Sequence, residues 1–132
     1  MDNDNLHNTL TKPSILLVED DETSISLTEI YLKNNYELES IKSGKDAVDR
    51  CKSKKFDLIL MDINLGSGIS GLEALMEIRN IADYKNTPII AFTAFAMRGD
   101  KEKFISAGCT HYLSKPFTKT QLIDIIKEAL KK

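Results

Sequence analysis

Three carboxylates, a hydroxyl and a lysine each stand at the end of an apolar segment in this sequence. The run "ILLVEDD" places Glu19 and Asp20 directly after four apolar residues, and "LILMD" ends in Asp62. In the same way, "IIAFT" ends in Thr93 and "HYLSK" ends in Lys115. Carboxylates gathered in one place repel one another unless a cation lies among them. These residue types therefore indicate a cation-binding site, provided that the fold brings them together.

Magnesium is the cation that fits this set of donors. It prefers oxygen ligands in an octahedron, keeps several of its waters and needs only one or two carboxylates from a protein. The charges of the three acids sum to −3, and Mg²⁺ together with Lys115 supplies +3. The histidines and cysteines form no zinc-like cluster in the sequence, so a zinc site is not predicted.

The composition is that of a globular protein with one sizeable core. The chain has 132 residues, of which 42% are hydrophobic and 29% charged, and its formal net charge is −2. Because there is no long basic run and no long apolar stretch, neither direct nucleic-acid binding nor a membrane span is predicted. The N-terminus has no apolar signal core, so we expect a cytoplasmic protein with Cys51 and Cys109 as reduced, structural thiols. Residues 1–13 are polar and are predicted to form a flexible lead-in to a domain at 14–132.

Two hydrophobic periods alternate along that domain. Short apolar segments predict strands at Ser14–Val18, Tyr36–Ile41, Asp57–Met61, Pro88–Phe92 and Thr110–Ser114. Helical periodicity predicts helices at about Glu22–Asn34, Lys45–Lys54, Leu72–Ala82, Met97–Ala107 and Lys119–Lys131. Asp21, Ser43 and Thr118 are suitable N-caps. The alternation indicates an α/β fold with a parallel sheet, and such sheets bind ligands beyond the carboxyl ends of their strands.

Each reactive residue also has a simpler interpretation. Asp62 can be read as a turn residue, Thr93 as a loop hydroxyl and Lys115 as a solvated charge. Taken singly, these interpretations are as good as a functional one. Together they account poorly for a polar residue that follows an apolar run four times at one predicted sheet edge.

Five motifs, in this order and spacing, resemble the receiver domain of two-component response regulators. They are "ILLVEDD", "LILMDINL", "GLEAL", "IIAFTA" and "HYLSKPF", and the resemblance extends from about Ser14 to Lys131. It implies a flavodoxin-like, doubly wound (βα)5 fold with a five-stranded parallel sheet in the order 2-1-3-4-5. It also implies a phosphoacceptor signalling domain that catalyses only its own phosphorylation and dephosphorylation and is not otherwise an enzyme.

The resemblance also assigns roles to individual residues. Asp62 is implied as the phosphoacceptor, whose carboxylate attacks a phosphohistidine donor and becomes an acyl phosphate. The implied Mg²⁺ site consists of Glu19, Asp20, Asp62 and the backbone carbonyl of Asn64. The implied phosphoryl-binding and switch residues are Thr93, Ala94, Tyr112, Lys115 and Pro116, with a cis peptide before the proline. After phosphorylation Thr93 is expected to swing toward the phosphoryl group and Tyr112 to turn into the vacated space, which alters the face of the fourth helix, fifth strand and fifth helix.

The implied partners are a sensor histidine kinase or a histidine phosphotransfer protein, and a downstream protein target. A monomer and a weak homodimer both agree with the sequence. A stand-alone regulator and a receiver taken from a larger protein, such as a hybrid histidine kinase, agree with it equally.

Three residues depart from the usual pattern of the family. Glu19 stands where aspartate is frequent, and its longer side chain favours ligation through a water. Gly66 stands where proline is common, in a loop one residue longer before Gly71, so we expect this loop to be more mobile. Phe95 lies where the family tunes acyl phosphate hydrolysis, and we hypothesise that its ring shields the site from water.

Three other functions agree less well with the sequence. A haloacid-dehalogenase-type phosphatase needs a second acid where this chain has Asn64, and it needs a substrate cap. A flavodoxin-like cofactor binder needs a phosphate loop rich in serine and threonine after the first strand, which is absent, as are nucleotide-binding glycine motifs. A degenerate receiver that acts only as an interaction module disagrees with the intact Asp20, Asp62, Thr93 and Lys115.

Overall fold

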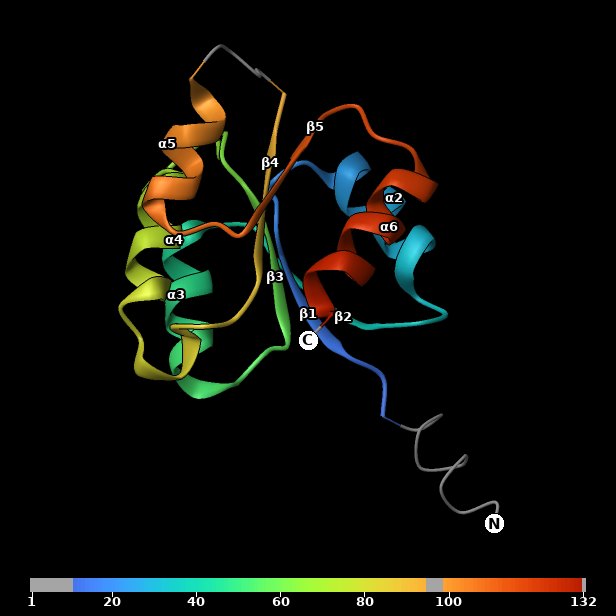
Figure 1. Cartoon of the computed structure of the whole chain (residues 1–132), viewed down its shortest axis with the longest axis horizontal. Helices are drawn as coiled ribbons and strands as arrows, with labels where there is room; N and C mark the ends of the chain where they lie inside the picture. The colour runs from blue at the N-terminus through green and yellow to red at the C-terminus, as the bar shows by residue number, and fades with distance from the viewer. Residues whose placement is uncertain (1–10, 95–98, 132) are drawn as a thin grey trace.

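The chain folds into a parallel sheet between two layers of helices, in a computed structural model that describes residues 11–94 and 99–131 (Figure 1). The strands are β1 (Ser14–Val18), β2 (Glu37–Ile41), β3 (Leu58–Asp62), β4 (Ile89–Thr93) and β5 (His111–Ser114). They form one five-stranded sheet in the order β2-β1-β3-β4-β5, and each neighbouring pair is parallel. The predicted fold class and strand order are therefore confirmed.

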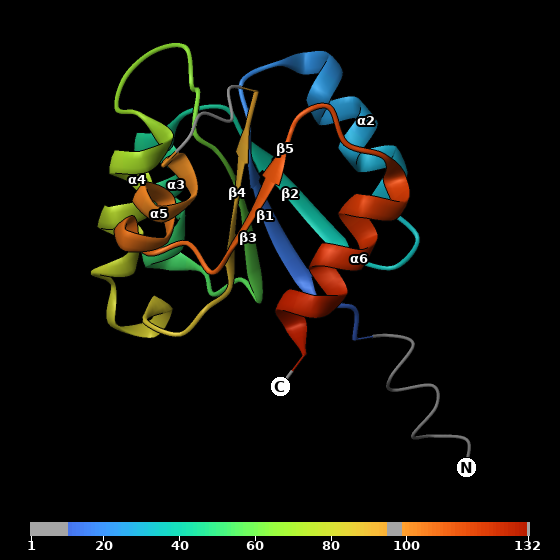
Figure 2. The ribbon, with the colours of Figure 1, turned by 45° about the horizontal axis from the view of Figure 1, so that its top comes forward.

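Helices cover both faces of this sheet. They are α2 (Glu22–Leu32), α3 (Gly44–Ser53), α4 (Gly71–Arg79), the short 3-10 helix η1 (Ala82–Tyr84), α5 (Asp100–Ala107) and α6 (Lys119–Leu130). In Figures 1 and 2, α3, α4 and α5 lie on one side of the sheet, and α2 and α6 lie on the other. The connection from β1 to β2 runs through α2 on one face, and the connection from β2 to β3 runs through α3 on the other, so the strand order reverses at β1. Open parallel sheets bind ligands at such a switch point.

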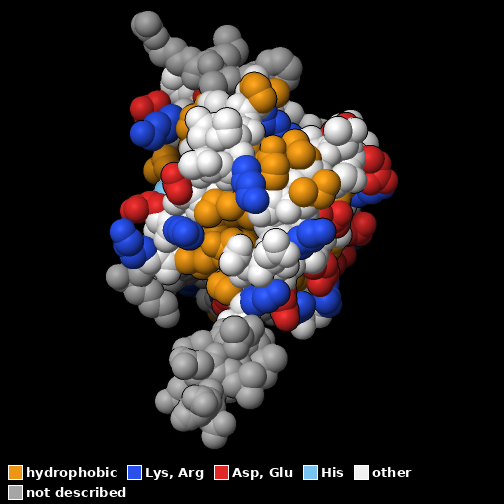
Figure 3. Space-filling view, turned by 90° about the vertical axis from the view of Figure 1, so that its right-hand side faces the viewer, with side chains coloured by type: hydrophobic (Ala, Val, Ile, Leu, Met, Phe, Trp, Pro, Cys, Tyr) orange, Lys and Arg blue, Asp and Glu red, His pale blue; other side chains and the backbone are white. Residues whose placement is uncertain are grey.

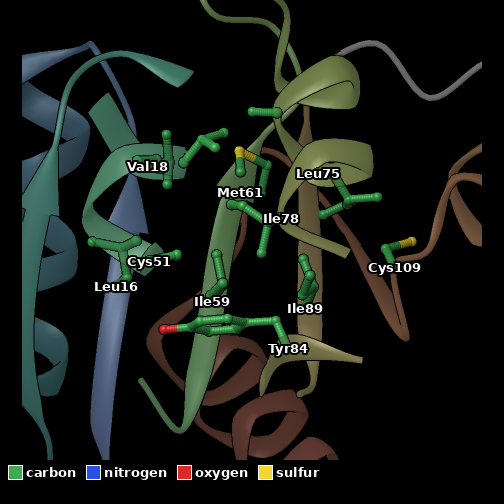
Figure 4. Close-up of a cluster of buried hydrophobic side chains, with 14 of the residues drawn as sticks. Leu16, Val18, Cys51, Ile59, Met61, Leu75, Ile78, Tyr84, Ile89 and Cys109 are labelled. Atoms are coloured by element: carbon green, nitrogen blue, oxygen red, sulfur yellow. The ribbon is translucent and has the colours of Figure 1, made fainter. Parts of the chain in front are cut away.

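The central strands supply side chains to two separate cores, because successive residues of a strand point to opposite faces. Leu16 and Met61 belong to the cluster on the α3, α4 and α5 side, which Figure 4 shows. Leu17 and Leu60 belong to the cluster beneath α2 and α6. All four side chains are fully buried, and this two-sided burial explains why β1 and β3 are continuously apolar.

The predicted helix caps are confirmed. The side chain of Asp21 accepts a hydrogen bond from the amide of Ser24, and that of Ser43 accepts one from Asp46. Thr118 forms a capping box at the start of α6. The first of these caps matters for the site, because it fixes the turn that carries the two acids after β1.

Most predicted elements agree with the observed ones to within two residues at each end, and two helices differ by more. The helix predicted at Leu72–Ala82 was three residues too long, because α4 ends at Arg79. The chain then becomes extended at Ile81 and continues into η1, while the Arg79 guanidinium donates to backbone carbonyls of Thr87 and Gly108. The helix predicted at Met97–Ala107 begins at Asp100 in the described chain, and its first predicted residues lie outside the described residues.

Both cysteines are buried free thiols, as predicted, and both lie in the core cluster of Figure 4. No helix within residues 11–94 and 99–131 is long and apolar enough to cross a membrane.

Candidate functional site

The residues that follow the strands meet at one edge of the sheet. Asp62 and Thr93 are the last residues of β3 and β4, and Lys115 comes directly after β5. Glu19 and Asp20 follow β1, so that carboxylate oxygens of both lie within 4.8 Å of one another and of one from Asp62. The carboxyl ends of parallel strands share an edge, and this is why residues far apart in the sequence meet here.

Lys115 is the cation of this acidic cluster. Its Nζ lies 2.6 Å from Oε1 of Glu19 and 3.4 Å from Oδ2 of Asp62. The Glu19 side chain is only 2% exposed, and that of Lys115 is 21% exposed. The peptide between Lys115 and Pro116 is cis, as the resemblance implied.

The cluster carries an excess of negative charge. Burial, and then the neighbouring Asp62, raise the pKa of Glu19 from 4.5 to about 7, although Lys115 opposes the change. Burial alone would lower the pKa of Lys115, but its interactions with Glu19 and Asp62 outweigh this effect and raise it. With the acids ionised, three carboxylates and one ammonium sum to −2.

This donor set fits a hard divalent cation. All three candidate ligands are carboxylates, and a charge of +2 would neutralise the excess. Asp20 is exposed whereas Glu19 and Asp62 are buried, so the cluster opens to solvent on the Asp20 side. That opening leaves room for the waters that Mg²⁺ keeps.

Asn64 connects Asp62 to the end of β4 through its backbone amide and its side chain. Its backbone amide donates to Oδ1 of Asp62 at 2.9 Å. Its side-chain Oδ1 accepts hydrogen bonds from the Thr93 hydroxyl at 3.1 Å and from the Ala94 amide at 3.4 Å. The sequence predicted only a backbone role for Asn64, because nothing in the pattern shows where a loop amide points.

The loop after β3 also reaches the acids. The backbone amide of Gly66 donates to Oδ2 of Asp20, with 2.8 Å between nitrogen and oxygen. The sequence showed that Gly66 stands where proline is common in the family, but it did not predict this contact with Asp20. Whether the loop is more mobile than usual stays a prediction.

Tyr112 packs against α5. It is half-buried on the α5 side, where its ring centroid lies 5.6 Å from that of Phe104. Its hydroxyl accepts a hydrogen bond from Ser114. The switch role of Tyr112 stays a prediction, and the hypothesis about Phe95 concerns a residue outside the described part of the chain.

Comparison with known proteins identifies the family. A model of the response regulator receiver domain matches residues 15–127. The polar-differentiation response regulator DivK of Brucella ovis is 38% identical over 118 residues, covering 89% of this chain and 95% of DivK. The chain therefore belongs to the response regulator receiver domain family, and its role is in two-component signalling.

Solved structures agree with this assignment. The receiver domain of the sensor histidine kinase PA1611 from Pseudomonas aeruginosa superposes with a TM-score of 0.83 and 35% identity, covering 91% of this chain and 98% of that domain. That structure holds a magnesium ion coordinated in its active-site cleft. The chemotaxis protein CheY4 of Vibrio cholerae gives a TM-score of 0.86 with 26% identity, covering 91% of this chain and all of CheY4 (100%).

Proposed function

We propose that Asp62 accepts a phosphoryl group from a phosphohistidine donor in a Mg²⁺-dependent reaction. The observation that carries this proposal is the juxtaposition of a buried carboxylate, Asp62, with two further acids, an ammonium and a hydroxyl. An oxygen of Asp62 forms the new P–O bond while the P–N bond of the donor breaks, and the histidine leaves with the bonding electrons. The product is an acyl phosphate. The transfer needs no other covalent participation of the protein.

The surrounding residues offset the charge of the incoming group. Lys115 already contacts Asp62, and its ammonium can follow the negative charge onto the phosphoryl oxygens. The Thr93 hydroxyl and the Ala94 amide at the end of β4 are further donors, and both contact Asn64 before phosphorylation. Mg²⁺, held by Glu19, Asp20, Asp62 and the backbone carbonyl of Asn64, would neutralise phosphoryl oxygens when bound.

The output is a change of surface shape, not turnover of a substrate. A phosphoryl group adds charge and three strong acceptor oxygens, so it competes with Asn64 for Thr93. We expect Thr93 and Tyr112 to move together and to alter the surface of α5, β5 and α6, where a downstream protein target binds. We place this signalling in the cytoplasm, without direct contact to nucleic acid or membrane, in a monomer or weak homodimer. The domain itself is assigned to residues 14–132, with 1–13 as a lead-in.

An apolar groove beside the site suits the phosphohistidine donor. The groove has a volume of 410 Å³ and lies between α2 and the segment after β5, where Leu27 and Phe117 join Lys115 in its lining. Leu27 is 44% exposed and Ile30, one turn further along α2, is 60% exposed. Figure 3 faces this side of the molecule and shows hydrophobic side chains at the surface among basic ones. A sensor kinase or phosphotransfer protein docked here would have its histidine next to Lys115 and Asp62.

Phosphorylation by a small donor tests the proposal. The protein is incubated with acetyl phosphate and either Mg²⁺ or EDTA, and the intact mass is measured. We expect a Mg²⁺-dependent gain of one phosphoryl group that is stable to acid and labile to alkali, absent in Asp62→Asn. Asp57→Asn is the matched control, because Asp57 precedes the same strand at its other end. Steady hydrolysis of phosphoesters would instead indicate a phosphatase, and no modification would indicate an interaction module.

A further inference from the structure

We propose that the backbone amide of Gly66 is a positioning group for Asp20, and that it sets the affinity of the acidic cluster for Mg²⁺. This inference rests on the proposed Mg²⁺ site and deepens it. It concerns the loop between β3 and α4, where the chain departs from the usual pattern of its family. The contact was not predicted from the sequence.

The first observation is the hydrogen bond itself. The Gly66 amide lies 2.8 Å from Oδ2 of Asp20, although the two residues are 46 positions apart. A carboxylate has two oxygens and about four lone-pair sites, so one donor leaves ample capacity for a metal. Outer hydrogen bonds of this kind orient a metal ligand before the metal arrives.

The second observation is the lack of space for a side chain at this position. A Cβ atom placed on Gly66 would lie 2.7 Å from Oδ2 of Asp20, closer than real Cβ atoms approach an oxygen. The positive-φ residues within the described chain are Gly68, Gly99 and Gly108, so the backbone conformation at Gly66 does not require glycine. Glycine is therefore needed at position 66 for close approach to Asp20 and not for turn geometry.

The three acids of the cluster are held in different ways. Glu19 is held by Lys115 and the amide of Asp21, and Asp62 by Lys115 and the amide of Asn64. Within the described residues, the Gly66 amide is the hydrogen-bond donor that reaches the side chain of Asp20. Asp20 is also exposed, so its side chain is free to rotate once this bond is lost. The orientation of this ligand therefore depends on the loop.

A substitution at position 66 should consequently act on the ligand and leave the fold intact. The atom that meets the added Cβ is the end of a flexible, exposed side chain, which can move at little cost. By contrast, Gly68 has φ of 73°, and a Cβ atom at that position would have no heavy atom within 4 Å. Gly68→Ala strains the same loop without touching Asp20, which makes it the matched control.

The test is metal affinity measured without phosphorylation. Parent protein, Gly66→Ala and Gly68→Ala are titrated with Mg²⁺ by calorimetry and with Mn²⁺ by the electron paramagnetic resonance signal of the free ion. We expect Gly66→Ala to weaken binding of both ions by about 10-fold, as loss of an outer hydrogen bond to a metal ligand does. We expect Gly68→Ala to bind as the parent does. Urea unfolding in EDTA should give the opposite ranking, with a lower midpoint for Gly68→Ala and an unchanged one for Gly66→Ala.

A kinetic measurement separates positioning from general damage. With acetyl phosphate as donor, Gly66→Ala should need more Mg²⁺ for half-maximal rate but reach the parental rate at saturation. Equal or tighter metal binding in Gly66→Ala would overturn the inference while leaving phosphorylation of Asp62, and hence the proposed function, intact. If the parent itself binds no Mg²⁺ and gains no phosphoryl group, the proposed function fails and this inference fails with it.

Discussion

The side-chain oxygen of Asn64 accepts a hydrogen bond from the hydroxyl of Thr93, with 3.1 Å between Oδ1 and Oγ1. The same oxygen also accepts from the Ala94 amide. An amide oxygen therefore occupies the two donors that we assign to the phosphoryl group. On the proposed function, a phosphoryl group on Asp62 would displace this oxygen, so the contact would favour the unphosphorylated state.

Removal of the Asn64 side chain should speed phosphorylation. Asn64→Ala removes the contacts of this side chain with Thr93 and Ala94 but keeps the backbone carbonyl assigned to Mg²⁺. One or two neutral hydrogen bonds of about 0.5–1.5 kcal/mol correspond to roughly a 3- to 10-fold faster reaction with acetyl phosphate. Mass spectrometry over time measures the rate. In a Thr93→Val background the same substitution should have a smaller effect, because only the Ala94 contact is left to remove, and a full effect there would contradict this explanation.

Stability without metal should fall as pH rises. The pKa of Glu19 is raised from 4.5 to about 7, so the folded state holds this proton more tightly than the unfolded state. The resulting stabilisation is fully present below the ordinary pKa and is lost as pH rises toward 7. We expect the free energy of unfolding in EDTA to drop by on the order of 1–3 kcal/mol over this range. The pKa values of Asp21 and Glu39 are lowered, so their opposite contributions arise at more acidic pH.

Urea denaturation at several pH values measures this dependence. Glu19→Gln carries no titrating group at this position and should flatten the slope. Saturating Mg²⁺ should flatten it in the parent protein, because a bound cation favours the ionised acids. A slope that is the same in parent and Glu19→Gln would show that another group is responsible.

Arg79 should be among the most important polar residues for stability. Its guanidinium donates to the backbone carbonyls of Tyr84, Thr87 and Gly108, and so joins the end of α4 to the segments before β4 and β5. Arg79→Met leaves these carbonyls without their donor, and we expect a loss of about 2–4 kcal/mol. Arg50→Met is the control, because its ion pair with Glu39 is partly exposed and should contribute about 0–1 kcal/mol. Urea unfolding compares the two.

The groove beside α2 should matter only for a protein donor. Leu27→Glu places a charge in the apolar lining and should slow transfer from a phosphorylated histidine kinase or phosphotransfer protein by 10-fold or more, about 1.4 kcal/mol or above. Reaction with acetyl phosphate should be unchanged, since this molecule needs no docking surface. Met76→Glu is the control on α4, where the side chain is similarly exposed at 46%. Equal slowing by both variants, or slowing with acetyl phosphate, would contradict a docking role.

The sequence predicted which residues meet but not how they contact one another. Asp62, Thr93 and Lys115 were placed together correctly, because a parallel sheet brings the carboxyl ends of its strands to one edge. The ion pair of Lys115 with Glu19 was not predicted, since it depends on the direction in which the Lys115 side chain points after β5. The contacts of Asn64 and Gly66 were missed for the same reason. Both residues lie in a loop, where the hydrophobic periodicity does not indicate in which direction a side chain or a backbone amide points.

The end of α4 shows a second limit of sequence patterns. Apolar periodicity continues through Ile81, so the helix was predicted to reach Ala82. The helix ends at Arg79, whose guanidinium donates to the backbone carbonyl of Gly108, 29 residues further along the chain. Local pattern cannot report such long-range contacts. Capping residues, by contrast, act within one turn, and Asp21, Ser43 and Thr118 were all predicted correctly.

The ion pair between Lys115 and Glu19 spans 96 positions of the chain. During synthesis on the ribosome, all three acids are made well before their lysine. A nascent chain therefore carries the acidic cluster without its internal counter-charge until the last strand has emerged and docked. On the proposed function, the ammonium assigned to the phosphoryl oxygens is therefore the last of these groups to join the site.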